Sequence, residues 1–560
     1  MQASGPNRVV TAAVFTISLI IAGCASTGGV APQTHGGTDP ATLDPGAAIR
    51  AADVDAHWPA TDWWRAYGDP QLDAWVDTAL ASSPTLAIAQ ARVRSAQALA
   101  GVAEADLAPQ VKGDLSIERQ HWPDNIYYGP GTLANSNTWD NTGALSQSYH
   151  LDLWGRDRNA AGRALDAAHA SAADARAAQL ELETNVVRAY IRLSMNYALL
   201  DIANSTLDQQ HQILALAQRR LKGGLGTQLE VSQAETPLPE YERQAEALHE
   251  AIALGQNQLA ALAGKGPGAG DAITRPKLAL NAPTSLPSTL PADLLGHRPD
   301  VVAARWTVAA QARGIDVAHA NFYPNIDLLA SIGGFAAAGP LFQFLHAENG
   351  GWTAGPAMSL PIFDGGRLRA QLGEASAGYD IAVGQYDQTV VNALKDVSDQ
   401  LVKLRSLSTQ EGDAERSVSA AQRSWQLSTE GYRRGLTDYV NVLIAQSQLL
   451  KAQEGVAKIQ AEKLAVHAQL VEALGGGLAD PSDAPSEADT LPGRKQNKRQ
   501  AGAGQAVGGA DAARGASGAS AANAGSTTNA VDATHAARVA GAAHTATVGN
   551  AASATTAALQ

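Results

Sequence analysis

The stretch that decides the fold is residues 155–221, GRDRNAAGRALDAAHASAADARAAQLELETNVVRAYIRLSMNYALLDIANSTLDQQHQILALAQRRL, which contain no proline. Large apolar residues recur there at every seventh position: Val186, Leu193, Leu200, Leu207, Leu214 and Leu221. A helix of this span is about 100 Å long at 1.5 Å per residue. A compact globular core does not use so long a helix, so the heptad spacing predicts coiled-coil pairing with a second helix.

The segment after residue 221 returns with the same heptad spacing: Val231, Leu238, Ala245, Ile252 and Leu259. A copy of this return helix follows 211 residues later: Val442, Leu449, Val456, Lys463 and Leu470. Pro237 and Pro239 stand early in the first return helix, where proline is tolerated at the first position but kinks an interior. We therefore expect the helix to restart at Pro237, with residues 226–235 as a separate turn.

The chain contains two copies of one plan. Two pairs of prolines are 215 positions apart, namely Pro84 with Pro299 and Pro109 with Pro324. Two pairs of glycines are 211 positions apart, namely Gly155 with Gly366 and Gly224 with Gly435. Because these residues mark element boundaries, chance matches between alanine-rich helices do not explain them. Each copy is expected to hold a helix, two short strands, a very long helix and a return helix.

The strands are predicted from alternation of apolar and polar residues with period two. The pattern occurs in four segments: 111–118, 145–153, 326–332 and 352–360. A barrel strand between lipid and water gives this pattern, and so does a strand of a soluble antiparallel sheet. Four strands cannot close a barrel, since about eight are needed and twelve or more leave an aqueous lumen. A homotrimer would supply twelve.

The start of the chain is predicted to be a lipoprotein signal peptide. An apolar run from Val9 to Ala22 follows Arg8 and is too short for a permanent membrane helix. It ends in Ile21-Ala22-Gly23-Cys24, which resembles a bacterial lipobox, and Cys24 is the only cysteine among 560 residues. We expect the thiol of Cys24 to be lipidated, although an ordinary leader with a free thiol gives the same residues.

Composition and motifs argue against other classes of function. The formal net charge of −13 and the pI of about 5.5 disfavour a nucleic-acid partner. The segment Ala263-Gly264-Lys265-Gly266 lacks the spacing and the Ser or Thr of a phosphate-binding loop. The chain has neither a His-Glu-x-x-His pair nor a Gly-x-Ser-x-Gly elbow. We therefore expect no enzyme activity, no cofactor and no metal site.

Residues 480–560 are rich in Ala, Gly, Ser and Thr, and such a segment is expected to be disordered. The predicted organisation is a signal peptide (1–23), a lipidated linker (24–57), a first repeat (58–285), a second repeat (286–479) and this tail (480–560).

Several motifs in this order resemble the TolC-type outer-membrane factors, in particular the lipoprotein branch with NodT-like and OprM-like channels. They are Trp63-Trp64 with Asp69-Pro70, Leu151-Asp152-Leu153-Trp154-Gly155-Arg156, Arg298-Pro299-Asp300-Val301, Leu360-Pro361-Ile362-Phe363-Asp364-Gly365-Gly366-Arg367 and Gly431-Tyr432-Arg433-Arg434-Gly435-Leu436. The resemblance extends roughly from Trp58 to Leu474. It implies an α+β membrane protein with long antiparallel coiled-coil helices. Its homotrimer would have a twelve-strand barrel and a helical tunnel across the periplasm.

The resemblance further implies the outer-membrane channel of a tripartite efflux pump, which passively conducts drugs or small organic and aromatic compounds. The implied partners are outer-membrane lipid, a periplasmic adaptor and an inner-membrane pump of the resistance-nodulation-division or major-facilitator kind. Two other functions stay open: an envelope-tethering lipoprotein without a pore, and a type I protein-secretion duct. An envelope hydrolase is a further rival, which the missing catalytic motifs disfavour.

The resemblance also suggests residues for a gate at the periplasmic tip. Tyr432 matches the family's gate tyrosine and Glu230 matches its acidic partner, although coiled-coil packing would also account for Tyr432. Two usual carboxylates are replaced by Asn441 and Ile444, which would weaken a cation-binding ring. The remaining candidates each have a second interpretation. Asp438 would substitute for a missing carboxylate or cap the return helix, and Arg433 and Arg434 would pair across protomers, meet an adaptor or be solvated.

Overall fold

The computed structural model describes residues 27–34, 36–50, 58–123, 135–279, 297–336, 341–477 and 490. The predicted signal peptide, Cys24 and the predicted tail, except for residue 490, lie outside the described residues. All described residues belong to one unit, which extends to Gln496.

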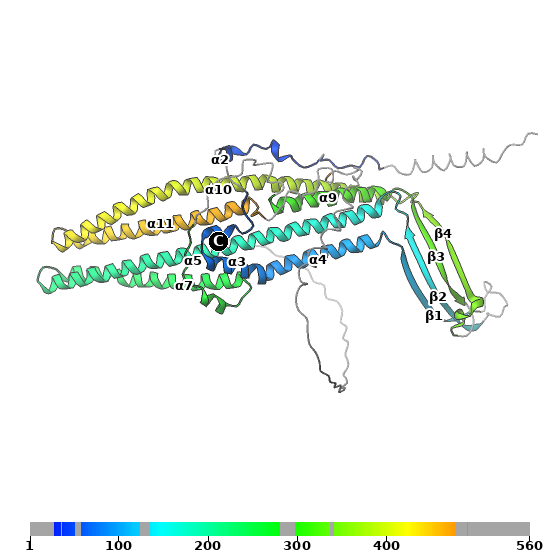
Figure 1. The fold of residues 1–560 in the computed structure, drawn as a ribbon, viewed down its shortest axis with the longest axis horizontal. Helices are drawn as coiled ribbons and strands as arrows, with labels where there is room; N and C mark the ends of the chain where they lie inside the picture. Colours follow the sequence, from blue (N-terminus) through cyan, green and yellow to red (C-terminus); the bar gives the residue numbers. More distant parts are fainter. Residues whose placement is uncertain are drawn as a thin grey trace, which may run out of the picture. The chain divides into compact units, whose positions relative to one another are not determined.

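The described elements follow the expected four-part plan twice (Figure 1). The first copy comprises α4 (Pro84–Ala105), β1 (Gln110–Trp122), β2 (Ser136–His150), α5 (Arg156–Lys222), α6 (Gln228–Glu235) and α7 (Leu238–Leu262). The second comprises α9 (Pro299–Ala320), β3 (Asn325–Ala336), β4 (Gly350–Ser359), α10 (Arg367–Arg433) and α11 (Tyr439–Ala473). Shorter elements are η1 (Pro40–Thr42), α2 (Gly46–Arg50), η2 (Trp63–Tyr67), α3 (Pro70–Ser82), η3 (Pro267–Ala272), η4 (Gln343–Leu345) and η5 (Ala347–Asn349).

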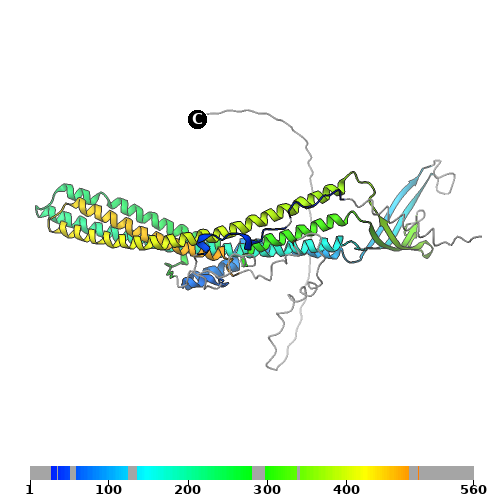
Figure 2. The same cartoon turned by 90° about the horizontal axis from the view of Figure 1, so that it is seen from above.

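The two long helices, α5 and α10, have 67 residues each, so each is about 100 Å long. α5 packs against α4, α7, α9 and α11, whereas α10 packs against α9 and α11. Figures 1 and 2 show both helices running from the sheet to the turns at the opposite end. Among the described residues, no helix is both long and apolar enough to cross a lipid bilayer.

The buried line of α5 departs from the predicted heptads. Val186, Leu193 and Leu200 are buried as expected, whereas Leu207 and Leu214 are only partly buried. After Leu200 the buried positions of the helix are Ala203, Thr206, Gln210, Ile213 and Ala217. These positions also recur every seven residues, as Ala203, Gln210 and Ala217 and as Thr206 and Ile213, so the buried line is displaced from the leucines but keeps the heptad spacing.

The first return helix is broken where the prolines predicted. α6 ends at Glu235, α7 begins at Leu238, and Pro237 occupies the N-cap between them. The expectation of a turn over residues 226–235 was wrong in one respect, because residues 228–235 form a short helix capped by Thr227. α11, the second copy, is continuous over 35 residues.

The four strands form one antiparallel sheet in the order β1-β2-β3-β4. Its register gathers apolar residues on one face, as in the exposed cross-strand row Leu145, Ile332 and Trp352. The next row, on the opposite face, is polar: Lys112, Ser146, Ser331 and Thr353. The outer edges of β1 and β4 pair with no other strand that the structure describes. The sheet is therefore amphipathic, and both of its edges are open.

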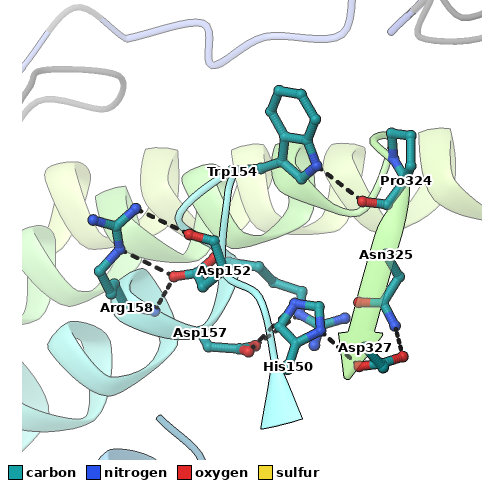
Figure 3. A network of polar contacts seen from close by, with 9 residues as sticks. His150, Asp152, Trp154, Asp157, Arg158, Pro324, Asn325 and Asp327 are labelled. Atoms are coloured by element: carbon teal, nitrogen blue, oxygen red, sulfur yellow. Dashed lines mark hydrogen bonds and ion pairs between the residues drawn. The ribbon is translucent and has the colours of Figure 1, made fainter. Parts of the chain in front are cut away.

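A polar network joins the sheet to the long helices (Figure 3). His150 at the end of β2 lies 2.9 Å from Asp327 of β3 and 3.5 Å from Asp157 of α5. Trp154 Nε1 donates to the carbonyl oxygen of Pro324 (2.9 Å). The carboxylate of Asp152 accepts the backbone N–H of Arg158 (3.0 Å), and Asp364 caps α10 in the same way. These contacts fix the direction in which the helices leave the sheet.

Residues 58–82, here called the collar, wrap the middle of the helices. Tyr190 of α5 donates to the carboxylate of Asp69 (2.8 Å), and Trp63 donates to Glu183 (3.3 Å). The Tyr67 hydroxyl donates to the carbonyl oxygen of Leu464 in α11 (2.9 Å). The collar therefore ties α5 to α11.

Residues 27–34 and 36–50, here called the strap, lie along α10. The carboxylate of Asp380 accepts the backbone N–H groups of Gln33 (3.1 Å) and Thr34 (3.0 Å). Further along, Arg405 donates to the carbonyl oxygen of Ala48 (3.2 Å). The strap therefore follows α10 over several turns.

Candidate functional site

The α5–α6 and α10–α11 turns lie at the end opposite the sheet and share one conformation (Figure 1). The N–H of Leu225 donates to the carbonyl of Arg220 (2.9 Å), and that of Leu436 donates to Gly431 (2.8 Å). Both turns require a left-handed residue, which the matched glycines supply: Gly224 (φ 72°) and Gly435 (φ 74°). The duplicated sequence thus produces two helical hairpins with equivalent tips.

The structure brings together Tyr432 and Glu230, the two residues proposed for the gate. The Tyr432 hydroxyl donates to a carboxylate oxygen of Glu230 (3.2 Å), which joins the second hairpin to the first. Tyr432 is only 1% exposed and packs in a cluster with Val231, Ala234 and Tyr439. Packing and polar contact therefore occur together, and the gating role stays a prediction.

Arg220 completes this contact, and the sequence analysis missed it. Its guanidinium donates to the carbonyl oxygens of Tyr432 (3.1 Å) and Leu225 (3.0 Å). It also lies over the Tyr432 ring (4.9 Å), and its Nε is 4.0 Å from Glu230. The position 211 residues later is Gly431, so the duplication gave no signal for it. We call Arg220, Glu230 and Tyr432 the tip latch.

A buried glutamine amide makes a further contact between the two hairpins, next to the latch. Gln210 is fully buried, and its side-chain amide donates to the carbonyl oxygen of Ala234 (2.6 Å) and to the hydroxyl of Tyr439 (2.9 Å). The rings of Tyr439 and Tyr432 are in contact, with centroids 5.8 Å apart. A buried polar group is costly to separate from its partners, so this layer resists parting of the hairpins.

The latch favours a protonated phenol. Burial raises the pKa of Tyr432 to about 12, and the charge and hydrogen bond of Glu230 act in the same direction, against the charge of Arg220. Tyr432 therefore remains a hydrogen-bond donor throughout the physiological pH range.

The printed side-chain contacts of the other gate candidates lie within the second hairpin. Asn441 is exposed and donates to the Thr437 hydroxyl (2.8 Å). Asp438 occupies the N-cap of α11, but its side chain makes no capping hydrogen bond. Arg434 donates to Glu430 (2.6 Å), and Arg433 lies 4.0 Å from the same carboxylate. Both arginines are exposed and have a local partner.

Apolar side chains surround the tips. Leu225 and Leu436, which match in the two repeats, are 74% and 78% exposed. Leu229 and Ile444 are exposed beside them. Among the described residues, no group of three or more His, Cys, Asp or Glu side chains is arranged to hold a metal ion.

Comparison with known proteins identifies the family. Residues 75–265 and 290–476 match the family described as outer membrane efflux protein. Fusaric acid resistance protein FusA of Burkholderia cepacia is 54% identical over 511 residues, which cover 90% of this chain and 94% of FusA. Multidrug resistance outer membrane protein MdtP of Escherichia coli (strain K12) is 31% identical over 428 residues, 75% of this chain and 87% of MdtP.

Among solved structures, the outer membrane protein VceC from Vibrio cholerae superposes with a TM-score of 0.70 at 33% identity, covering 75% of this chain and 100% of that one. The long helices and the four antiparallel strands are thus a shared architecture. The chain belongs to the outer membrane efflux protein family: it is an efflux-pump channel of the outer membrane, not an enzyme, and extends into the periplasm.

Proposed function

We propose that this chain forms a homotrimeric, lipid-anchored duct for small aromatic carboxylic acids, which opens when its tip latches part. The observation that carries the proposal is the amphipathic four-stranded sheet with two open edges. Unpaired strand edges are costly in a membrane, and four strands are too few to close on themselves. Pairing β1 of one protomer with β4 of the next joins twelve strands into a closed barrel.

The helices support the same assembly. α4 carries large apolar side chains that are more than half exposed in the single chain: Ile88, Leu99 and Val102. An apolar stripe at helical spacing normally packs against another element. Contact between neighbouring protomers would bury this stripe and align the three helical sections around one bore.

The strap supports a lipid on Cys24 and membership of the lipoprotein branch. Gly28 lies beside Arg369, in the first turn of α10 and therefore near the sheet. Four residues span at most about 14 Å, so a lipid attached four positions before Gly28 would be close to the sheet end of the helices. An acyl chain there would enter the outer membrane, and each buried methylene would contribute about 0.8 kcal/mol.

The substrate class comes from the relatives. FusA, which is named for fusaric acid resistance, is similar over nearly its whole length. Fusaric acid is a pyridine carboxylic acid, so an aromatic ring and a carboxylate define the proposed cargo. A periplasmic adaptor docks on the exposed tip leucines, and an inner-membrane pump of the resistance-nodulation-division or major-facilitator kind supplies the energy.

Fusaric acid accumulation and resistance test this proposal in a host from which the gene for this chain has been deleted. We expect deletion to raise intracellular fusaric acid, and the full chain to restore export when its pump and adaptor are present. Cys24→Ser should leave less channel in the outer-membrane fraction. Unchanged fusaric acid accumulation after deletion would contradict the substrate class, and an unchanged membrane fraction for Cys24→Ser would contradict the anchor.

A further inference from the structure

A basic groove lies among α5, α7 and α11, at the level of the collar. Its volume is about 350 Å³. The charged side chains that line it are Arg188 and Arg192 on α5, and Lys458 and Glu462 on α11. Three cations thus face one carboxylate, in a chain whose formal net charge is −13.

Both arginines can reach a ligand, although the positive charge of Arg188 also acts on the carboxylate of Glu472. Neither guanidinium donates a hydrogen bond to another residue in the part of the chain that the structure describes. Lys458, in contrast, is held by Glu454 at 3.0 Å. Arg188 and Arg192 are four residues apart on one helix, so their side chains are neighbours and can converge on one carboxylate. Arginine suits this role because its planar fork matches a carboxylate.

The floor of the groove is apolar. Ile191 and Ala189 line it and are only 2% and 6% exposed, and the other uncharged residues of α5 and α7 in the lining are Met195, Asn185 and Gln258. A volume of about 350 Å³ is at the lower end of the usual range of ligand sites, about 300–1,000 Å³. The groove can take one small aromatic ring lying on the floor, with its carboxylate directed at the arginines.

The groove opens away from the collar. Tyr190 contacts the collar through Asp69, and Arg188, two residues earlier, lies about 200° around the helix from it. On α11 the groove residue Ala465 is likewise two residues from His467, which contacts Tyr67 of the collar. In the proposed duct the collar packs outside, because the bore must stay open, so the groove faces the bore. This step rests on the proposed function.

We propose that the basic groove is a transit site for small aromatic carboxylates. A transit site must bind strongly enough to draw the ligand in and weakly enough to release it. Two exposed guanidiniums above a shallow apolar floor meet both requirements. Three such grooves in a trimer would favour entry of organic anions into an otherwise acidic protein.

Binding of 4-fluorobenzoate to the detergent-solubilised full chain, followed by fluorine NMR, tests the groove directly. We expect Arg188→Gln with Arg192→Gln to weaken binding at least about tenfold, since two charge-assisted contacts are lost. The lysine pair, Arg188→Lys with Arg192→Lys, should retain part of the affinity. The matched control, Lys403→Gln with Arg423→Gln, removes two exposed charges from α10 outside the groove and should leave binding unchanged.

Two outcomes would overturn the site: equal affinity of the groove and control variants for 4-fluorobenzoate, or equal binding of neutral 4-fluorobenzamide by the wild type. Single-channel recording separates this proposal from the proposed function. If the groove variant conducts current with the anion selectivity of the wild type, the transit site is rejected and the proposed duct is not. Binding of 4-fluorobenzoate by trimers that carry no current rejects the duct, and with it the transit role.

Discussion

Arg220 makes polar contacts in both hairpins. It satisfies one carbonyl in its own turn and one in the other hairpin, and it stacks on Tyr432. Without it, the carbonyl of Tyr432 keeps the N–H of Gly435 but loses its charged donor, and the Tyr432 ring loses a cation. Hydrogen bonds that involve a charged group contribute about 1.5–3 kcal/mol each, so the latch holds the tips closed by a modest free energy.

Removing latch residues should open the channel in the absence of its pump. We expect Tyr432→Phe with Glu230→Ala, and separately Arg220→Ala, to increase the open probability in planar bilayers by about tenfold, since 1.4 kcal/mol corresponds to a factor of ten. Sensitivity to large antibiotics should rise in parallel. Arg416→Ala on α10, whose partner Asp413 is also exposed, is the control. Equal open probability in all variants would reject the latch as a gate.

Two buried groups beside the collar respond to pH in opposite directions. Burial lowers the pKa of His467 to about 4, so the unfolded chain binds more protons between pH 6.5 and 4. Burial raises the pKa of Glu183 to about 7, against the hydrogen bonds from Gln179 and Trp63, so the folded chain binds more protons between pH 4.5 and 7. His467 therefore costs stability as pH falls, and Glu183 costs stability as pH rises.

Glutamine variants should separate these two effects. We expect the Tm of His467→Gln to fall less than that of the wild type as pH falls from 6.5 to 4, because the variant avoids a loss of about 3 kcal/mol in the free energy of unfolding at the acid end. Glu183→Gln should lose less Tm than the wild type as pH rises from 4.5 to 7. Thermal unfolding in detergent across pH 4–8 measures both, and parallel curves for all three proteins would contradict the assignment.

At the residue scale the sequence supported part of the site. The Tyr432–Glu230 pair was predicted from family motifs, and the structure brings these residues into contact. Arg220 and Gln210 were missed because each bonds to the other hairpin, more than 200 positions away for the Tyr432 and Tyr439 contacts. Heptad and repeat patterns describe each hairpin separately, so they carry no information about polar contacts between hairpins.

At the element scale, the strap depends on a few hydrogen bonds to α10. Asp380 accepts two backbone N–H groups and the Thr34 hydroxyl. Burial raises the pKa of Asp380, but these bonds outweigh it and hold the pKa below its usual value. Gly37 contributes differently, since a Cβ there would lie 2.5 Å from a ring carbon of Tyr386. The strap therefore needs both a carboxylate and a glycine.

Amide hydrogen exchange measures how strongly α10 protects the backbone N–H groups of the strap. We expect Asp380→Ala to speed exchange of the Gln33 and Thr34 amides by about tenfold or more, since bonds to a charged acceptor are lost. Gln33→Ala is the matched control, because the backbone of Gln33, not its side chain, donates to Asp380. Equal protection in the two variants would show that Asp380 does not hold this part of the strap.

Most elements were predictable, since each is encoded locally. The four strands follow from alternation, and the break before α7 follows from Pro237. The buried residues of α5 after Leu200 were not predictable, because the neighbouring helices decide which of two heptad-spaced lines is buried. The strap and the collar were also beyond reach, because each is positioned by contacts with helices far away in the sequence.

At the scale of the whole molecule, the open sheet edges lead to a cross-linking prediction. Lys112 of β1 and Thr353 of β4 stand in one cross-strand row, three strand spacings or about 14 Å apart. With cysteines at both positions, a bismaleimide shorter than that distance can join only different protomers. We expect denaturing gels to show dimers and trimers and no larger species.

The matched control carries cysteines at Ser146 and Ser331, which are direct partners in the two central strands. Its cross-link should remain within one chain and leave the apparent mass unchanged. A monomer band alone from the edge variant, at a reagent concentration that cross-links the control, would contradict closure through β1 and β4.

The two hairpins are alike in their tips and unlike in their stems, because α6 and α7 are separated at Pro237 whereas α11 is continuous. In a trimer, hairpins with a broken return helix would alternate around the threefold axis with hairpins whose return helix is continuous. The six tips would therefore form two sets of three. A partner with six identical binding elements would therefore contact two different kinds of hairpin tip. Such a partner would bend the three first hairpins, which are broken at Pro237, before the three second hairpins. The opening at the tips would therefore be triangular before it became circular.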